Sequence, residues 1–296
     1  MKKYKLIIFI IGFFAIPGQV TTAQSYTLVV DNFTIVAKPG DSLIVKFLAE
    51  VISTNRTRME TFFDIRLADT VLILLPGSQS AFEQITGQRL PEWSAAVAFP
   101  DLNKIVLKPG DYFNPGLYSE SLLHELTHIY IHACLPDNSV PVWFNEGLAM
   151  YLSNTAISWE QSITIGNAVV AQNLLSFEDI ERMIRFHKGQ AGIAYIQSYL
   201  AVEYLVEQFG PHSLRDILTA LKTGRNIAAA FQFALGIEYV DFEYLYVKWL
   251  KNKYWWLVFL QIKYLLWIII LGLVFLAIVI VKLRNRAVIR KWADEE

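Results

Sequence analysis

Cysteine is almost absent from this sequence, and so is any excess of charge of one sign. Cys134 is the only cysteine among 296 residues, which excludes an intrachain disulfide. The formal net charge at pH 7 is -1, so the composition gives no indication of a nucleic-acid partner. Internal repeats and low-complexity linkers are also missing. We therefore expect a domain that is held together by its hydrophobic core and that binds no nucleic acid.

The first residues have the layout of a secretory signal peptide. Three lysines among the first five residues precede a short apolar run at 6–16, which Pro17 and Gly18 end. Small residues up to Ala23 then offer a cleavage site. We expect residues 1–23 to be removed after export. An uncleaved anchor is the alternative, although the run is short for a bilayer span.

A second apolar run lies near the other end of the sequence. Residues 264–281 contain no charged side chain and are just long enough to cross a bilayer as a helix. The tail at 282–296 contains five basic residues, which mark the cytoplasmic side of a span, and aromatic residues at 254–256 suit the opposite interface. We expect a single-pass protein of the cell membrane whose body, residues 24–253, lies outside the cytoplasm. The lack of disulfides favours a bacterial cell envelope.

The body of the chain begins with strand-like segments and continues with helices. Runs rich in β-branched and aromatic residues predict strands at 26–38 and 41–47, joined by a turn at Pro39-Gly40. Together with the later helical patterns they predict an α+β fold, in which a small N-terminal sheet precedes a helical core and one C-terminal transmembrane helix. The other predicted elements are strands from Thr70, at 95–99 and at 103–107, and helices at 79–86, 117–134, 141–152, 177–186, 191–209, 214–222, 227–235 and 240–254.

Histidine is scarce, with 5 in the chain, yet two histidines share the stretch HELTH at 124–128. In a helix His124 and His128 lie on one face, one turn apart, so both can direct a ring nitrogen at one metal ion. Glu125 is rotated by about 100° from His124 and can reach a metal-bound water. This is the HExxH arrangement, and neutral imidazoles suit Zn²⁺. His132 lies one further turn along a straight helix, so we expect it to have a supporting role.

A hydrolytic zinc site needs a third protein ligand, and Glu146 is the candidate. It lies in the next predicted helix, within VPVWFNEGLAMYLS, 18 residues after His128. A turn around Pro136 allows this helix to fold back on the first. Gly147 follows, and because glycine within a helix costs about 1 kcal/mol relative to alanine, it indicates close packing, which we expect against the metal helix. The alternative for Glu146 is a solvated carboxylate, which its apolar neighbours disfavour.

Three stretches, HELTHIYIH, PVWFNEGLAMYL and AYIQSYLAVEYLVEQFG, resemble the peptidase MA-like domain family. These domains are gluzincin-type zinc metallopeptidases, related in their catalytic core to the M1 aminopeptidases. The resemblance covers roughly residues 70–250 and implies a zincin-like core. It further implies that His124, His128 and Glu146 bind zinc and that Glu125 is the general base.

The resemblance also implies a tyrosine that stabilises the oxyanion from a later helix. Tyr195 resembles that residue, and Tyr199 is the rival. The aminopeptidase signature Gly-x-Met-Glu-Asn is absent from the sequence, which argues against amino-terminal trimming. The strand at 104–107, just before the metal helix, is expected to offer its edge to an extended peptide.

These patterns together predict a membrane-anchored zinc metallopeptidase. It would hydrolyse peptide bonds of a peptide or protein substrate outside the cytoplasm, with Glu125 activating a zinc-bound water. The alternative is a catalytically silent, peptidase-like binding or assembly module of the cell envelope. The sequence leaves open which substrate is cleaved, whether cleavage is internal or terminal, and the oligomeric state.

Overall fold

A computed structural model describes most of the chain, which forms two compact units. Unit 1 is Met1–Ala156 with Leu175–Tyr246, and unit 2 is Ile157–Leu174 with Val247–Glu296. The predicted signal peptide and the predicted turn around Pro136 lie outside the described residues. The described residues are 25–87, 95–110, 114–135, 140–186, 191–260 and 262–293.

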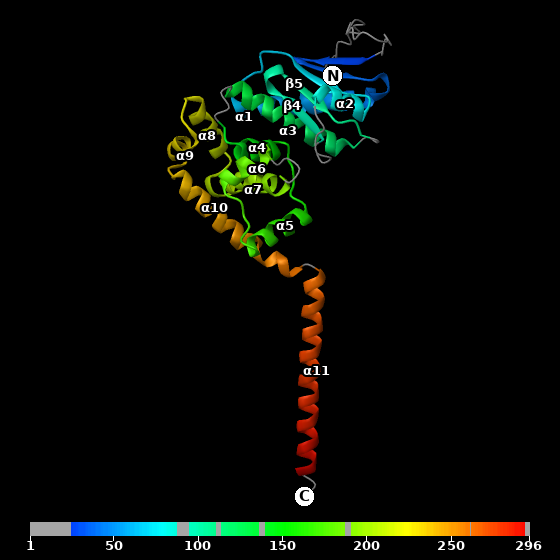
Figure 1. Cartoon of the computed structure of the whole chain (residues 1–296), viewed down its shortest axis with the longest axis vertical. Helices are drawn as coiled ribbons and strands as arrows, with labels where there is room; N and C mark the ends of the chain where they lie inside the picture. Colours follow the sequence, from blue (N-terminus) through cyan, green and yellow to red (C-terminus); the bar gives the residue numbers. More distant parts are fainter. Residues whose placement is uncertain are drawn as a thin grey trace. The chain divides into compact units, whose positions relative to one another are not determined.

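A five-stranded mixed sheet begins unit 1, and helices α1 (Ser42–Phe63) and α3 (Pro115–Cys134) pack against it (Figure 1). The strand order is β1-β2-β3-β5-β4. The pairs β1–β2 and β4–β5 are antiparallel, whereas β3 is parallel to both β2 and β5. Parallel neighbours need a crossover connection, which α1 supplies between β2 and β3. The strands are β1 (Tyr26–Val30), β2 (Phe33–Ala37), β3 (Val71–Leu75), β4 (Ala96–Phe99) and β5 (Lys104–Leu107).

The strand predicted at 41–47 is wrong, because these residues begin the long helix α1. The buried residues of α1 include Val45, Leu48, Ile52 and Met59, which recur at helical spacing along one face. A window of seven residues with several β-branched side chains does not contain enough of that period to reveal it.

The strand predicted at 26–38 is two strands, β1 and β2, which form a hairpin. Asp31 begins the turn between them with φ of 53°, in the left-handed region that aspartate tolerates better than most residues. The strands predicted from Thr70 and at 95–99 and 103–107 are confirmed as β3, β4 and β5.

The helices predicted in unit 1 are confirmed, with ends that differ by at most two residues. Helix α3 begins after Asn114, whose side chain accepts a hydrogen bond from the backbone N–H of Leu117, and Pro115 occupies its first turn. The others are α2 (Gln79–Thr86), α4 (Val142–Leu152), α6 (Phe177–Phe186), α7 (Gly192–Phe209), α8 (Ser213–Lys222), α9 (Ile227–Leu235) and α10 (Tyr239–Tyr254), the last of which continues into unit 2.

Helix α4 is fixed by an aromatic core and by a carboxylate at its first turn. The ring of Trp143 stacks on Phe177 at a centroid distance of 4.2 Å, and its Nε1–H donates to the hydroxyl of Tyr239 at 2.7 Å. The carboxylate of Glu181 accepts the backbone N–H of Val142 at 2.8 Å. A negative charge there satisfies an N–H group without an intrahelical partner and complements the helix dipole. These contacts anchor the helix that carries the candidate third ligand.

Unit 2 contains a helix that the sequence patterns did not reveal. Helix α5 (Trp159–Val170) starts with a capping box, in which the side chains of Ser158 and Gln161 each accept a backbone N–H of the other residue. It packs against the 3-10 segment η4 (Trp255–Leu260), which precedes the long helix α11 (Ile262–Ala293).

Helix α11 contains one segment, Leu265–Arg286, that is long and apolar enough to cross a membrane, by length and composition. The predicted fold class is therefore confirmed: the chain is α+β, with a small N-terminal sheet, a mostly helical core and one C-terminal apolar helix.

Candidate metal centre

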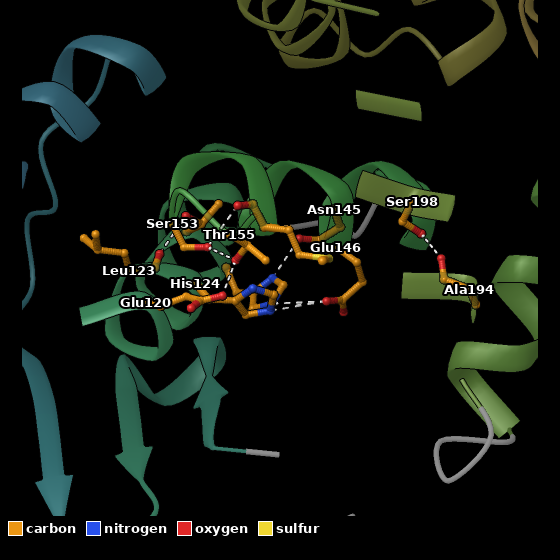
Figure 2. A network of polar contacts seen from close by, with 12 residues as sticks. Glu120, Leu123, His124, Asn145, Glu146, Ser153, Thr155, Ala194 and Ser198 are labelled. Carbon is orange, nitrogen blue, oxygen red and sulfur yellow. Dashed lines mark hydrogen bonds and ion pairs between the residues drawn. The ribbon is translucent and has the colours of Figure 1, made fainter. Parts of the chain in front are cut away.

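Two helices of unit 1 bring three predicted metal ligands together. His124 and His128 are one turn apart on α3, and Glu146 of α4 points towards His124 (Figure 2). The Nε2 atoms of His124 and His128 lie 3.4 Å and 3.7 Å from Oε2 of Glu146. One ligand atom of each residue lies within 4.8 Å of the others. In a tetrahedral zinc site with bonds near 2.0–2.1 Å, ligand atoms are about 3.3 Å apart, so this set fits one ion.

Asn145, which the sequence analysis did not single out, orients one of the histidines. Nδ1 of His128 lies 2.8 Å from Oδ1 of Asn145. Because a side-chain carbonyl oxygen can only accept, Nδ1 of His128 carries the proton and donates it. Nε2 of His128 is then unprotonated, and its lone pair faces the side of Glu146. This is the tautomer that a metal ion requires. The only sequence signal for Asn145 is its position beside Glu146.

The surroundings of His124 favour positive charge. Burial lowers the pKa of His124, but a hydrogen bond with Glu146 and the negative charges of Glu125, Glu146 and Glu120 outweigh burial, so the pKa is raised above its usual value. Carboxylates that stabilise an imidazolium also stabilise a divalent cation, since both interactions are electrostatic attractions to the same negative potential. The donor set and the charge around it therefore both fit a zinc ion.

Tyr195 and Tyr199 of α7, the two candidates for the tyrosine that stabilises the oxyanion, have different neighbours. Burial raises the pKa of Tyr195, and the charges of Glu146 and Glu125 raise it further. Burial also raises the pKa of Tyr199, but there the charges are those of Glu203 and Tyr151. Tyr195 is thus the tyrosine that shares its surroundings with the candidate third ligand and base. Because its pKa is raised, its hydroxyl stays protonated near neutral pH and retains a proton that it can donate in a hydrogen bond.

Gly147 packs closely, but against α7 rather than the metal helix, so the expected partner was wrong. A Cβ atom on Gly147 would lie 2.3 Å from the carbonyl oxygen of Ser198 and 2.8 Å from Cγ2 of Val202. Only glycine allows two helix backbones to approach this closely. The contact holds α7, which carries Tyr195, directly against α4, which carries Glu146.

A hydroxyl network joins α3 to the segment that follows α4 (Figure 2). The hydroxyl of Thr155 donates to Oε1 of Glu120 at 2.6 Å and lies 2.9 Å from the hydroxyl of Ser153. Ser153 also hydrogen-bonds the carbonyl oxygen of Met150 at 3.0 Å. Glu120 is one turn before His124 on α3. The two helices that carry the ligands are therefore tied together beside the site as well as across it.

His132, for which the sequence predicted a supporting role, lies away from the three ligands. Its Nε2 lies 3.4 Å from Oδ1 of Asp101 in the turn between β4 and β5.

The predicted substrate strand must also be corrected. Strand β5, at Lys104–Leu107, lies between β3 and β4, so its two sides are already paired and the edge belongs to β4 (Ala96–Phe99). Chain order suggested β5 because it is the last strand before α3. However, β4 pairs antiparallel with β5 and covers its outer side.

A long part of the sequence matches the model of a known family. The family model described as the peptidase MA superfamily matches residues 65–252, more than half of the chain. The matched region starts before β3, includes α3, α4 and α7, and ends within α10. A comparison with curated proteins finds no match. Because the match covers more than half of the chain, this chain belongs to the peptidase MA superfamily.

Proposed function

We propose that this protein is a membrane-anchored zinc metallopeptidase that hydrolyses peptide bonds outside the cytoplasm. The observation that carries the proposal is the convergence of His124, His128 and Glu146, whose ligand atoms lie within 4.8 Å of one another. The superfamily is generally zinc-dependent, which agrees with this donor set. Glu125, next to the first ligand, gives the site a base that a purely structural metal site does not need.

The residues around the metal position divide the reaction between them. A zinc ion held by His124, His128 and Glu146 would supply a Lewis acid for the scissile carbonyl. Glu125 accepts the proton of the attacking water and passes it to the leaving amine. Tyr195, kept protonated by its raised pKa, donates a hydrogen bond to the carbonyl oxygen as negative charge develops there. Asn145 holds the ring of His128 in the required tautomer.

Strand β4 is the candidate for binding an extended peptide. Within the described residues no strand pairs with its outer side, and α3 packs against it. A strand at the edge of a sheet can add one more strand, which fixes a peptide through main-chain hydrogen bonds. We assign the substrate backbone to this edge, in place of β5.

The two apolar ends of the sequence support the topology that we propose. Residues 1–23 have the layout of a signal peptide, and the basic residues that follow the candidate span favour a cytoplasmic C-terminal end. We therefore assign residues 24–253 to the extracytoplasmic domain, 264–281 to the transmembrane helix and 282–296 to the cytoplasmic tail of a bacterial membrane protein.

Zinc content and hydrolysis, measured on the purified full-length chain in detergent, test the proposal. We expect about one zinc per wild-type chain, as one His₂Glu site requires. Glu146→Ala should lose zinc, and Glu125→Gln should keep zinc and lose hydrolysis of a peptide library. Glu178→Ala is the matched control, since this glutamate is exposed on α6, and it should keep both.

The outcomes separate the enzyme from a catalytically silent module. A folded wild-type chain that binds no zinc after reloading would contradict the metal site. Zinc binding without hydrolysis of any peptide would favour the peptidase-like binding or assembly module. Unchanged hydrolysis in Glu125→Gln would remove this residue from the mechanism.

A further inference from the structure

Unit 2 exposes large apolar side chains outside the candidate membrane span. Trp255, Trp256 and Phe259 of η4 and Trp159 and Val170 of α5 are each between 43% and 55% exposed. A single exposed apolar residue is ordinary on a protein surface, but five such residues on two segments that pack together form a pattern. Three of the five are tryptophans, which favour the boundary between water and lipid.

Helix α5 exposes a large apolar side chain at each end, in addition to its buried face. Trp159 and Val170 are 11 residues apart, which at about 100° per residue places them within about 20° of each other around the helix axis. The buried residues Ile165, Ala168 and Val169 lie on another side, whereas buried Gly166 lies between Trp159 and Val170 on their side and packs against η4. A helix that packs on a core through one face has no structural need for exposed apolar side chains at both of its ends.

Close packing makes α5 and η4 one surface, although they are distant in the sequence. A Cβ atom on Gly166 of α5 would lie 2.9 Å from the carbonyl oxygen of Tyr254 and 3.1 Å from Cβ of Leu257. Tyr254 and Leu257 are buried, whereas the tryptophans next to them are exposed. The inner side of η4 therefore receives α5, and its outer side adds to the exposed surface.

The chain itself indicates what covers this surface. Segment η4 ends at Leu260, and α11, which contains the candidate membrane span, begins at Ile262. The exposed side chains of Lys251 and Lys253 precede η4, and basic residues beside a span attract anionic headgroups. The surface is thus continuous along the chain with the segment that enters the bilayer.

We propose that α5 and η4 form an interfacial collar, a surface of unit 2 that lies in the headgroup region of the lipid bilayer. Its members are Trp159, Val170, Trp255, Trp256 and Phe259. The proposal rests on the membrane anchoring by α11 proposed above. It adds that a segment about 90 residues earlier in the sequence than η4 also contacts lipid, so the anchor is a small folded unit rather than a helix on a tether.

Site-directed spin labelling of the full-length chain tests the collar. In a Cys134→Ala background, labels are attached to Trp159→Cys, Val170→Cys, Trp267→Cys and Phe233→Cys. The last is the matched control, an exposed apolar residue of α9 in unit 1. The protein is reconstituted into vesicles of phosphatidylethanolamine and phosphatidylglycerol, and accessibility to oxygen is compared with accessibility to a water-soluble nickel chelate. Only variants that retain the wild-type circular dichroism and Tm are scored; the labels at 159 and 170 are independent, so either can carry the test.

We expect the labels at 159 and 170 to favour oxygen over the nickel chelate, as the label at 267 in α11 does, and the label at 233 to favour the chelate. Water-exposed labels at 159 and 170 with a lipid-exposed label at 267 would overturn the collar and leave the anchor intact. A water-exposed label at 267 would overturn both. Spin–spin broadening at 159 that grows with the protein-to-lipid ratio would overturn the collar in favour of contact between copies.

Discussion

Replacing Gly147 by alanine should loosen the packing between α4 and α7. The new Cβ would lie 2.3 Å from the carbonyl oxygen of Ser198, whereas ordinary contact begins at 3.4 Å, so the helices must separate by about 1 Å. The atom in the way belongs to the backbone, so no rotamer change can remove the overlap.

Two opposing terms determine the size of the effect. Overpacking of this kind costs about 1–3 kcal/mol, and we expect the upper part of that range because the backbone must move. Alanine recovers about 1 kcal/mol of helix propensity. The net destabilisation of about 1–2 kcal/mol corresponds to a decrease in Tm of about 2–8 °C for a domain of this size.

The same displacement should affect hydrolysis more than metal binding. Glu146 precedes Gly147, and Tyr195 is on α7, so a separation of the two helices moves the tyrosine away from the ligand set. A misplacement of about 1 Å can cost about 100-fold in rate. We expect Gly147→Ala to lose about that much in kcat while it keeps zinc, because α3 and α4 still face each other.

Calorimetry, zinc analysis and peptidase assays on the full-length chain test this reasoning. Gly192→Ala is the matched control, since no atom lies within 4 Å of the Cβ position at that glycine of α7, and it should be neutral or slightly stabilising. A Tm and kcat of Gly147→Ala equal to those of the wild type would refute the argument.

Three further predictions concern single side chains. Asn145→Ala should weaken zinc binding by about 10–100-fold in chelator competition, whereas Asn145→Asp keeps an acceptor and should stay near the wild type. Tyr195→Phe should lower kcat by about 10²–10³-fold with little change in KM, and Tyr199→Phe should not; equal losses would contradict the assignment. Hydrogen bonds from Ser176 lower the pKa of Asp179, so its contribution to stability is present above the unfolded pKa and is lost as the pH falls through the folded pKa. Asp179→Asn should therefore lower Tm at pH 7, and thermal scans below about pH 4 should show that difference shrinking.

The parts of the site that depend on local geometry could be identified from the sequence. A helix places His124 and His128 one turn apart whatever surrounds it, so their spacing alone indicates that they can bind one metal ion together. Asn145 could not be identified in this way, because its hydrogen bond with His128 depends on how α3 and α4 cross. The partner of Gly147 was missed for the same reason, since close packing can be inferred from a helical glycine but the opposing helix cannot.

The errors in the predicted fold also arise from non-local structure or from sequence windows that are too short to show a helical period. The first turn of α1 reads as a strand until Leu48, Ile52 and Met59 extend the helical period. The start of α5 could have been predicted, because Ser158 and Gln161 form a capping pattern that is visible in the sequence. The edge position of β4 could not be predicted, because chain order does not determine which strand of an antiparallel pair lies outermost.

The position of the ligands along the chain has a consequence for biosynthesis. Glu146 follows His124 by 22 positions, whereas Tyr195 follows Glu146 by another 49. At about 5–20 residues per second, the three proposed ligands are synthesised about 2–10 seconds before that tyrosine. Helix α7, which packs on Gly147, is also still missing at that stage. In the proposed enzyme, the growing chain would therefore contain its three metal ligands before its oxyanion tyrosine, and hydrolysis would begin only once α7 has been made and docked.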